Sequence, residues 1–63
     1  MKWLKRKQEG PWIYDTFQYN PKVETVDTIK AQYFADYPPQ AYDSTLVQVT
    51  DREVTLKRWY TAD

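Results

Sequence analysis

Residues that commonly carry out catalysis are scarce in this chain of 63 residues. It has no histidine and no cysteine, and Ser44 is its only serine. General acid–base catalysis most often uses histidine, and a nucleophilic serine needs a neighbouring base to activate it. One glycine is too few for a glycine-rich phosphate loop. With so little room for a substrate cleft, the sequence predicts a protein that is not an enzyme.

Carboxylates are the remaining groups that could react or bind a metal ion. A pair of carboxylates can hydrolyse glycosides unaided, and Asp51 with Glu53 could contact a cation. Two acids in a β-turn are usually solvated, however, and the lack of cysteine and histidine excludes disulfides and Cys/His zinc sites. We therefore predict no catalytic residue, no metal site and no cofactor.

Aromatic residues are abundant instead, with three Trp, six Tyr and two Phe. A chain this short buries only about 60% of its unfolded surface, and each aromatic side chain can bury about 150–250 Å². Eleven of them exceed what a thin core needs, which predicts an exposed aromatic surface. Such residues dominate protein interfaces, and they also stack on bases in single-stranded nucleic-acid binders.

The charges are segregated although they sum to zero. Residues 1–8, which include the sequence KWLKRK, carry four positive charges and no acid, whereas residues 9–43 carry six acids against two lysines, a local charge of −4. The basic segment is interpreted as a solvated terminus, a nucleic-acid contact or an anchor on an acidic protein. Four charges alone would give only weak, salt-sensitive nucleic-acid binding.

An amphipathic helix is predicted over residues 25–37. Thr25 can cap its start, with Asn20-Pro21 as a rival start one turn earlier. Pro38 ends it, since proline restricts the residue before it and cannot continue a helix. An apolar stripe runs along one side and consists of Val26, Ile29, Tyr33, Phe34 and Tyr37.

The stretch YPPQAY (residues 37–42) allows two interpretations. It is either a polyproline signal that a partner binds or a helix stop with a stiff connection into a strand at Ser44. The spacing fits neither Pro-Pro-x-Tyr nor P-x-x-P, so we favour the helix stop.

Alternation of apolar and polar residues predicts the strands. Residues 45–60 form a hairpin around a turn at 50–53, in which Val49 pairs with Val54 and Val47 with Leu56. Residues 11–19 form a third strand after a turn at Gly10-Pro11. Residues 2–7 add an edge strand or remain a loose arm.

The fold class that follows is α+β. We expect a single domain, residues 1–63, with a small antiparallel or mixed sheet of three to four strands and one helix on one face, in the order β-(β)-α-β-β; residues 1–8 are a basic arm or edge strand. One helix covers only one face, so Leu46, Lys57 and Trp59 are expected on the open face. Residues 11–19 add either Trp12 and Tyr14 or Ile13 and Phe17.

We therefore predict a non-enzymatic protein-binding module that occupies a surface of a larger enzyme as an accessory or inhibitory protein, of a size typical of phage and mobile-element proteins. The alternatives are a nucleic-acid-binding module and a structural subunit that is stable only as an oligomer. No stretch has the roughly 20 apolar residues of a membrane span, and a cytoplasmic location is expected. The predicted partner-binding residues are Trp3, Lys5, Arg6, Lys7, Trp12, Tyr14, Leu46, Lys57 and Trp59.

Overall fold

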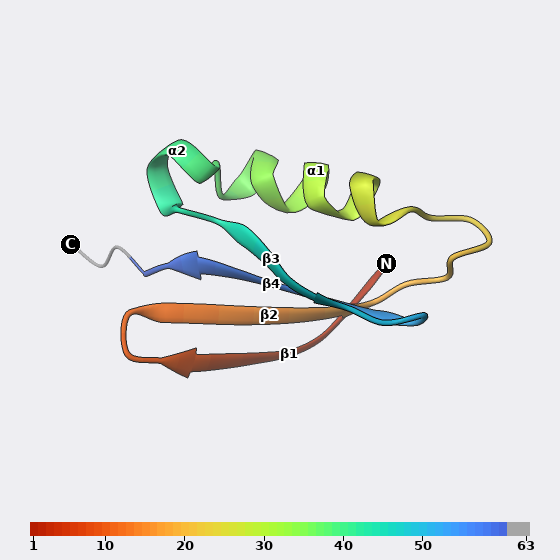
Figure 1. Ribbon diagram of the computed structural model, residues 1–63, viewed down its shortest axis with the longest axis horizontal. Coiled ribbons are helices and arrows are strands. Elements are labelled where there is room, and N and C mark those ends of the chain that lie inside the picture. The colour runs from red at the N-terminus through yellow and green to blue at the C-terminus, as the bar shows by residue number, and fades with distance from the viewer. Residues whose placement is uncertain (61–63) are drawn as a thin grey trace.

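The computed structural model describes residues 1–60 and confirms the α+β fold (Figure 1). Four antiparallel strands lie in the order β1-β2-β4-β3. The strands are β1 (Lys2–Glu9), β2 (Trp12–Gln18), β3 (Thr45–Val49) and β4 (Glu53–Trp59), and the helices are α1 (Val26–Asp36) and α2 (Pro39–Tyr42). The central pair β2–β4 thus joins segments from the two ends of the chain.

The basic N-terminal segment is an edge strand rather than a loose arm. A two-residue loop, Gly10-Pro11, joins β1 to β2, and Glu9 pairs with Trp12 across it. Gly10 has a φ of +59°, as the first central residue of a primed hairpin turn requires. Between Trp3 and Lys5 the register shifts, which marks a β-bulge near the start of the strand.

The helix α1 begins where its capping residue predicts. The Thr25 hydroxyl accepts a hydrogen bond from the backbone N–H of Thr28, and the Thr28 hydroxyl accepts one from the N–H of Thr25. This reciprocal cap satisfies two backbone donors that would otherwise lack partners. Asn20 accepts bonds within a turn that precedes the helix, so it does not start the helix.

The helix ends at the prolines, as predicted, but the connection that follows contains a short second helix, α2. Asp43 ends α2 in the left-handed conformation, with a φ of 54°. The rings of Tyr37 and Tyr42 pack edge to face at 5.6 Å, and the Ser44 hydroxyl donates to the Tyr37 carbonyl. The double proline therefore lies in a folded corner.

The register of the C-terminal hairpin is only partly as predicted. Val49 pairs with Val54, but Leu46 rather than Val47 pairs with Leu56, because the register shifts between Leu46 and Gln48. An extra residue in β3 moves the alternation by one position. Leu46 consequently packs against the core, whereas Val47 is 46% exposed. The expectation that Leu46 lies on the open face is wrong.

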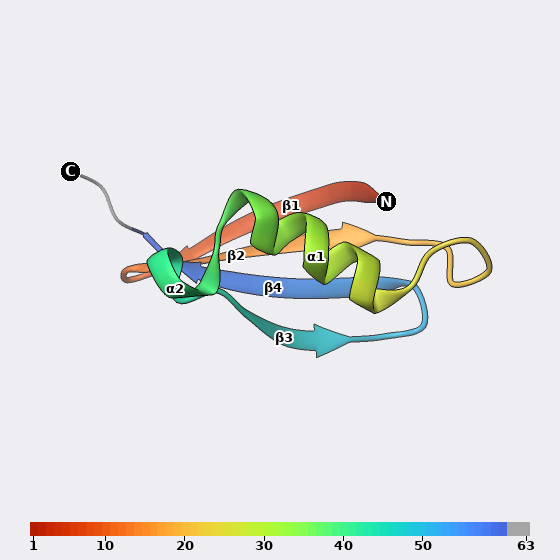
Figure 2. The same ribbon diagram turned by 90° about the horizontal axis from the view of Figure 1, so that it is seen from above.

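The core lies between α1 and the central strands. Figure 2 shows α1 crossing over β2 and β4, with β1 and β3 at the two sides. The buried apolar residues of the core are Ile13 from β2, Ile29 and Tyr33 from α1, and Val54 and Leu56 from β4. No element within residues 1–60 covers the opposite face of the sheet (Figure 1). Neither helix in this part of the chain is long and apolar enough to cross a membrane.

Candidate functional site

The uncovered face of the sheet carries a compact aromatic group at one end. Trp12 on β2 pairs with Trp59 on β4, and Tyr14 pairs with Lys57. The two indoles pack edge to face with their centroids 5.0 Å apart, and the Lys57 ammonium lies 4.2 Å above the Trp12 ring. Trp59 is 40% exposed. We call these four residues, Trp12, Tyr14, Lys57 and Trp59, the aromatic face.

Two further lysines border the aromatic face from the edge strand. Lys7 pairs with Tyr14, and Lys5 pairs with Thr16, so alternation places both lysines on the uncovered side. The Lys7 ammonium lies 3.6 Å from the Glu9 carboxylate in an exposed ion pair. The aromatic face is therefore flanked by cations on β1 and contains a third, Lys57, within it.

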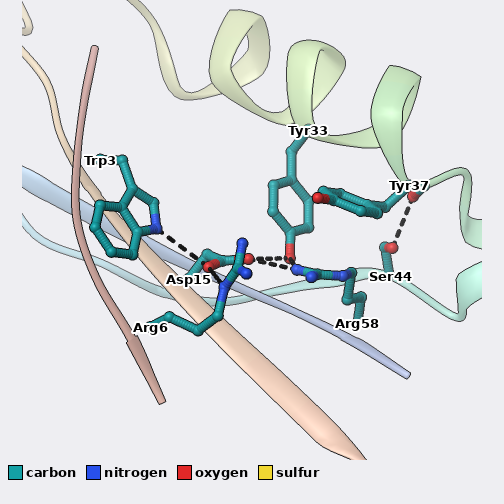
Figure 3. Close-up of polar contacts among 7 residues, drawn as sticks. All are labelled: Trp3, Arg6, Asp15, Tyr33, Tyr37, Ser44 and Arg58. Carbon is teal, nitrogen blue, oxygen red and sulfur yellow. Dashed lines mark hydrogen bonds and ion pairs between the residues drawn. The ribbon is translucent and has the colours of Figure 1, made fainter. Parts of the chain in front are cut away.

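The helix-facing side of the same strands holds a buried ionic group that sequence reasoning missed. Asp15 is 1% exposed and lies between β1, β4 and α1 (Figure 3). One carboxylate oxygen, Oδ1, accepts bonds from Arg6 Nε at 2.7 Å and Trp3 Nε1 at 3.2 Å. The other, Oδ2, accepts bonds from Arg58 at 2.5 Å and the Tyr33 hydroxyl at 3.0 Å. We call Trp3, Arg6, Asp15, Tyr33 and Arg58 the Asp15 cluster.

The donors around Asp15 determine its protonation state. Burial by itself would raise the pKa of Asp15, but hydrogen bonds from Arg6, Trp3 and Tyr33 outweigh it and hold that pKa below its usual value. Burial raises the pKa of Tyr33 to about 12, although the bond from Arg58 acts in the opposite direction. Asp15 is consequently ionised and Tyr33 neutral throughout the physiological range.

The Asp15 cluster is built to hold strands and helix together rather than to bind a ligand. An ionised carboxylate has about four acceptor sites, and four donors already occupy those of Asp15. The guanidinium of Arg58 also stacks 3.9 Å above the Tyr37 ring. A crevice of about 210 Å³ opens beside the cluster, between β1 and α1. No buried side-chain N or O atom in residues 1–60 lacks a hydrogen-bond partner.

A larger groove of about 610 Å³ lies at the end of the sheet opposite the aromatic face. Its lining mixes the cations Lys2, Lys22 and Arg52 with the acids Glu24 and Asp51, and Glu24 pairs with the N-terminal ammonium. Because both signs of charge line it, this groove points to no particular class of ligand. Within residues 1–60 no three acidic side chains come close enough together to hold a metal ion.

The structure brings together only part of the predicted binding set. Trp12, Tyr14, Lys57 and Trp59 share one patch, and Lys5 and Lys7 lie next to it. The remaining three are elsewhere: Trp3 and Arg6 turn to the helix side and donate to Asp15, and Leu46 lies against the core.

The sequence contains a signal for the buried pair Asp15 and Arg58, which the sequence analysis did not use. Alternation places Asp15 on the same side as Ile13 and Phe17, and Arg58 on the same side as Leu56 and Val54. One acid and one base, each within an apolar stripe, indicate a buried ion pair.

Comparison with protein-family models, with curated proteins and with solved structures gives no match for this chain.

Proposed function

We propose that this chain is a non-enzymatic protein-binding module whose aromatic face docks on the surface of a larger cytoplasmic protein. The observation that carries the proposal is that two tryptophans and a tyrosine share a sheet face that no described element covers. Tryptophan, tyrosine and arginine supply most of the binding free energy at protein interfaces. Docking on an enzyme would make the chain an accessory or inhibitory protein.

The arrangement of the rings favours protein over single-stranded nucleic acid. Stacking on a base needs a free ring face. In Trp12 the Lys57 ammonium already occupies one face, and the ring also packs edge to face against Trp59. A rigid aromatic block of this kind suits insertion into an apolar pocket, because little side-chain entropy remains to be lost on binding.

The charges around the aromatic face define the partner further. Lys5 and Lys7 flank it on β1, and Lys57 lies within it. We therefore expect the partner to offer an apolar pocket with an acidic rim, since complementary rim charges accelerate association and orient the partners.

The test uses affinity capture from the native host followed by binding measurements on the purified pair. Trp59→Ala should weaken the complex about thirtyfold or more, the effect of removing a buried aromatic anchor of about 2 kcal/mol. Val23→Ala is the matched control, because Val23 is 77% exposed in the loop before α1, away from the aromatic face. It should leave the affinity within about twofold.

Two outcomes would contradict the proposal. One is binding of a mixed-sequence single-stranded oligonucleotide at physiological salt that Lys5→Gln with Lys7→Gln abolishes, which would support nucleic-acid binding. The other is concentration-dependent self-association that Trp59→Ala removes, which would support the structural-subunit interpretation. Sedimentation analysis of the isolated chain distinguishes the second outcome.

A further inference from the structure

The outer edge of β1 is open along its length. In the sheet order β1 pairs with β2 alone, and all eight of its residues are exposed. Figure 2 shows β1 at one side of the sheet with no described segment beyond it. In an antiparallel pair the residues alternate in whether their N–H and C=O groups face the neighbouring strand. Every second residue of β1 therefore directs its backbone donor and acceptor outward.

Positive side chains accompany this open edge on both faces. Lys5 and Lys7 lie on the uncovered face, while Arg6 lies on the helix side with its side chain 49% exposed. Only Glu9, at the hairpin end, is acidic. Side chains directly opposite one another on paired strands interact, and like charges there are destabilising.

This pattern selects against a second copy and in favour of an acidic strand. Two β1 strands paired antiparallel and centred on Arg6 would place Arg6 opposite Arg6 and Lys5 opposite Lys7. The other edge of the sheet, β3, has five residues, no charged side chain and a bulge near its middle. An acidic partner segment therefore finds charge complementarity at β1 and none at β3.

We propose that β1 accepts an extended acidic segment of another protein as a fifth strand of the sheet. Backbone hydrogen bonds to the outward groups of β1 supply affinity, as in other cases of strand addition. Alternate acidic side chains of the added strand face Lys5 and Lys7 on one side and Arg6 on the other. Beyond the bulge the regular part of the edge spans Lys5–Glu9, which defines the main binding register. This proposal concerns backbone groups and is separate from docking through the aromatic face.

The probe is a fluorescent synthetic peptide of about eight residues, the length of β1. Its glutamates stand in adjacent pairs, so that each pair presents one carboxylate to each face of the sheet, and the other positions are threonine or valine. Anisotropy at low salt should show saturable binding of this peptide and none of its lysine counterpart. Lys5→Gln with Lys7→Gln should weaken binding about 2- to 30-fold, the range for two exposed ion pairs. Lys22→Gln with Lys30→Gln changes the net charge equally outside the Lys5–Glu9 register, and it should keep the affinity within about twofold.

Two N-methylated peptides separate strand addition from general attraction between charges. Methyl groups on one set of alternate amides block the hydrogen bonds to β1, and methyl groups on the other set point to solvent. We expect the first peptide to lose at least tenfold in affinity and the second to bind like the parent. Equal affinities of the two methylated peptides would overturn the proposal. Displacement of the parent and of both methylated peptides by an oligonucleotide at the same concentration would also overturn it. The absence of binding would also overturn it, and would mean that the charges of β1 serve only to prevent edge-to-edge association.

NMR chemical-shift mapping of the ¹⁵N-labelled chain provides an independent measurement that needs no variant. The peptide should shift the backbone amides of β1 and the indole N–H of Trp3, and leave the indole N–H groups of Trp12 and Trp59 in place. Shifts confined to Trp12 and Trp59 would put the peptide on the aromatic face and refute strand addition.

Discussion

Replacing Asp15 by asparagine tests the role of the buried cluster most directly. The substitution keeps the shape of the side chain but removes the charge and converts one acceptor into an NH₂ donor. Whichever way the amide turns, that donor meets either the pair Trp3 and Arg6 or the pair Tyr33 and Arg58. Arg58, whose side chain is 9% exposed, is left buried without its counter-ion.

The expected loss is large relative to the stability of the domain. Removing one partner of a buried ion pair costs about 3–5 kcal/mol, whereas a domain of this size has roughly 3–9 kcal/mol in total. Arg6→Gln should cost only about 1 kcal/mol, because the Arg6 side chain is half exposed and water replaces its contact. Loss of the buried ion pair with Arg58 should therefore cost far more unfolding free energy than loss of the half-exposed ion pair with Arg6.

Urea denaturation followed by tryptophan fluorescence measures these free energies of unfolding. Variants that are unfolded in buffer are refolded with trimethylamine N-oxide, which favours the compact state. In a double-mutant cycle, Asp15→Asn and Arg58→Met together should cost less than the sum of the single changes by about 1–3 kcal/mol. An Asp15→Asn variant within 1 kcal/mol of the parent chain would refute the assignment of Asp15 as the central anchor.

Three further predictions concern the helix cap, the strand register and alkaline pH. Thr25→Ala should lower the free energy of unfolding by about 0.5–2 kcal/mol through loss of the cap, and an unchanged urea midpoint would contradict the capping box. Leu46→Ala should cost about 1–3 kcal/mol and Val47→Ala less than about 0.5 kcal/mol, because only Leu46 packs on the core; the reverse order would restore the unbulged register. Between pH 10 and pH 12 the unfolded chain loses the Tyr33 proton while the folded chain keeps it, so stability should fall by about 2–3 kcal/mol as pH rises. Titration of the unfolding free energy should show this component in the parent chain and not in Tyr33→Phe.

Local patterns were sufficient to predict α1 and the strands β2, β3 and β4, but not the short helix α2 or all of the contacts. The capping threonine, the apolar stripe and the prolines define α1, since each acts within one turn of the residue that carries it. The bulge in β3 could not be predicted, because Leu46 and Val47 are both apolar and suit a strand equally well. Only the packing of α1 selects Leu46 as the residue that faces the core.

The candidate site shows the same division between local pattern and spatial contact. Lys57 and Trp59 were predicted on the open face, because alternation along a strand is a local property. For residues 11–19, alternation left either Trp12 and Tyr14 or Ile13 and Phe17 on that face, and only the pairing with β4 selects Trp12 and Tyr14. The orientation of Trp3 and Arg6 toward the helix side could not be predicted, since it depends on a carboxylate on the neighbouring strand. Asp15 itself was missed because its four partners come from three elements, and two of these, α1 and β4, are distant from it in sequence.

The pairing of β2 with β4 has a consequence for how the chain folds during synthesis. Thr16 and Thr55, whose hydroxyls lie 3.0 Å apart, are separated by 39 positions in the chain. A ribosome adding about 5–20 residues per second needs about 2–8 s to proceed from β2 to the end of β4. Throughout this interval β1 can pair with one edge of β2, while the other edge and its aromatic side chains stay unpaired. A nascent chain of this topology therefore depends on its first hairpin to limit aggregation until its last strand is made.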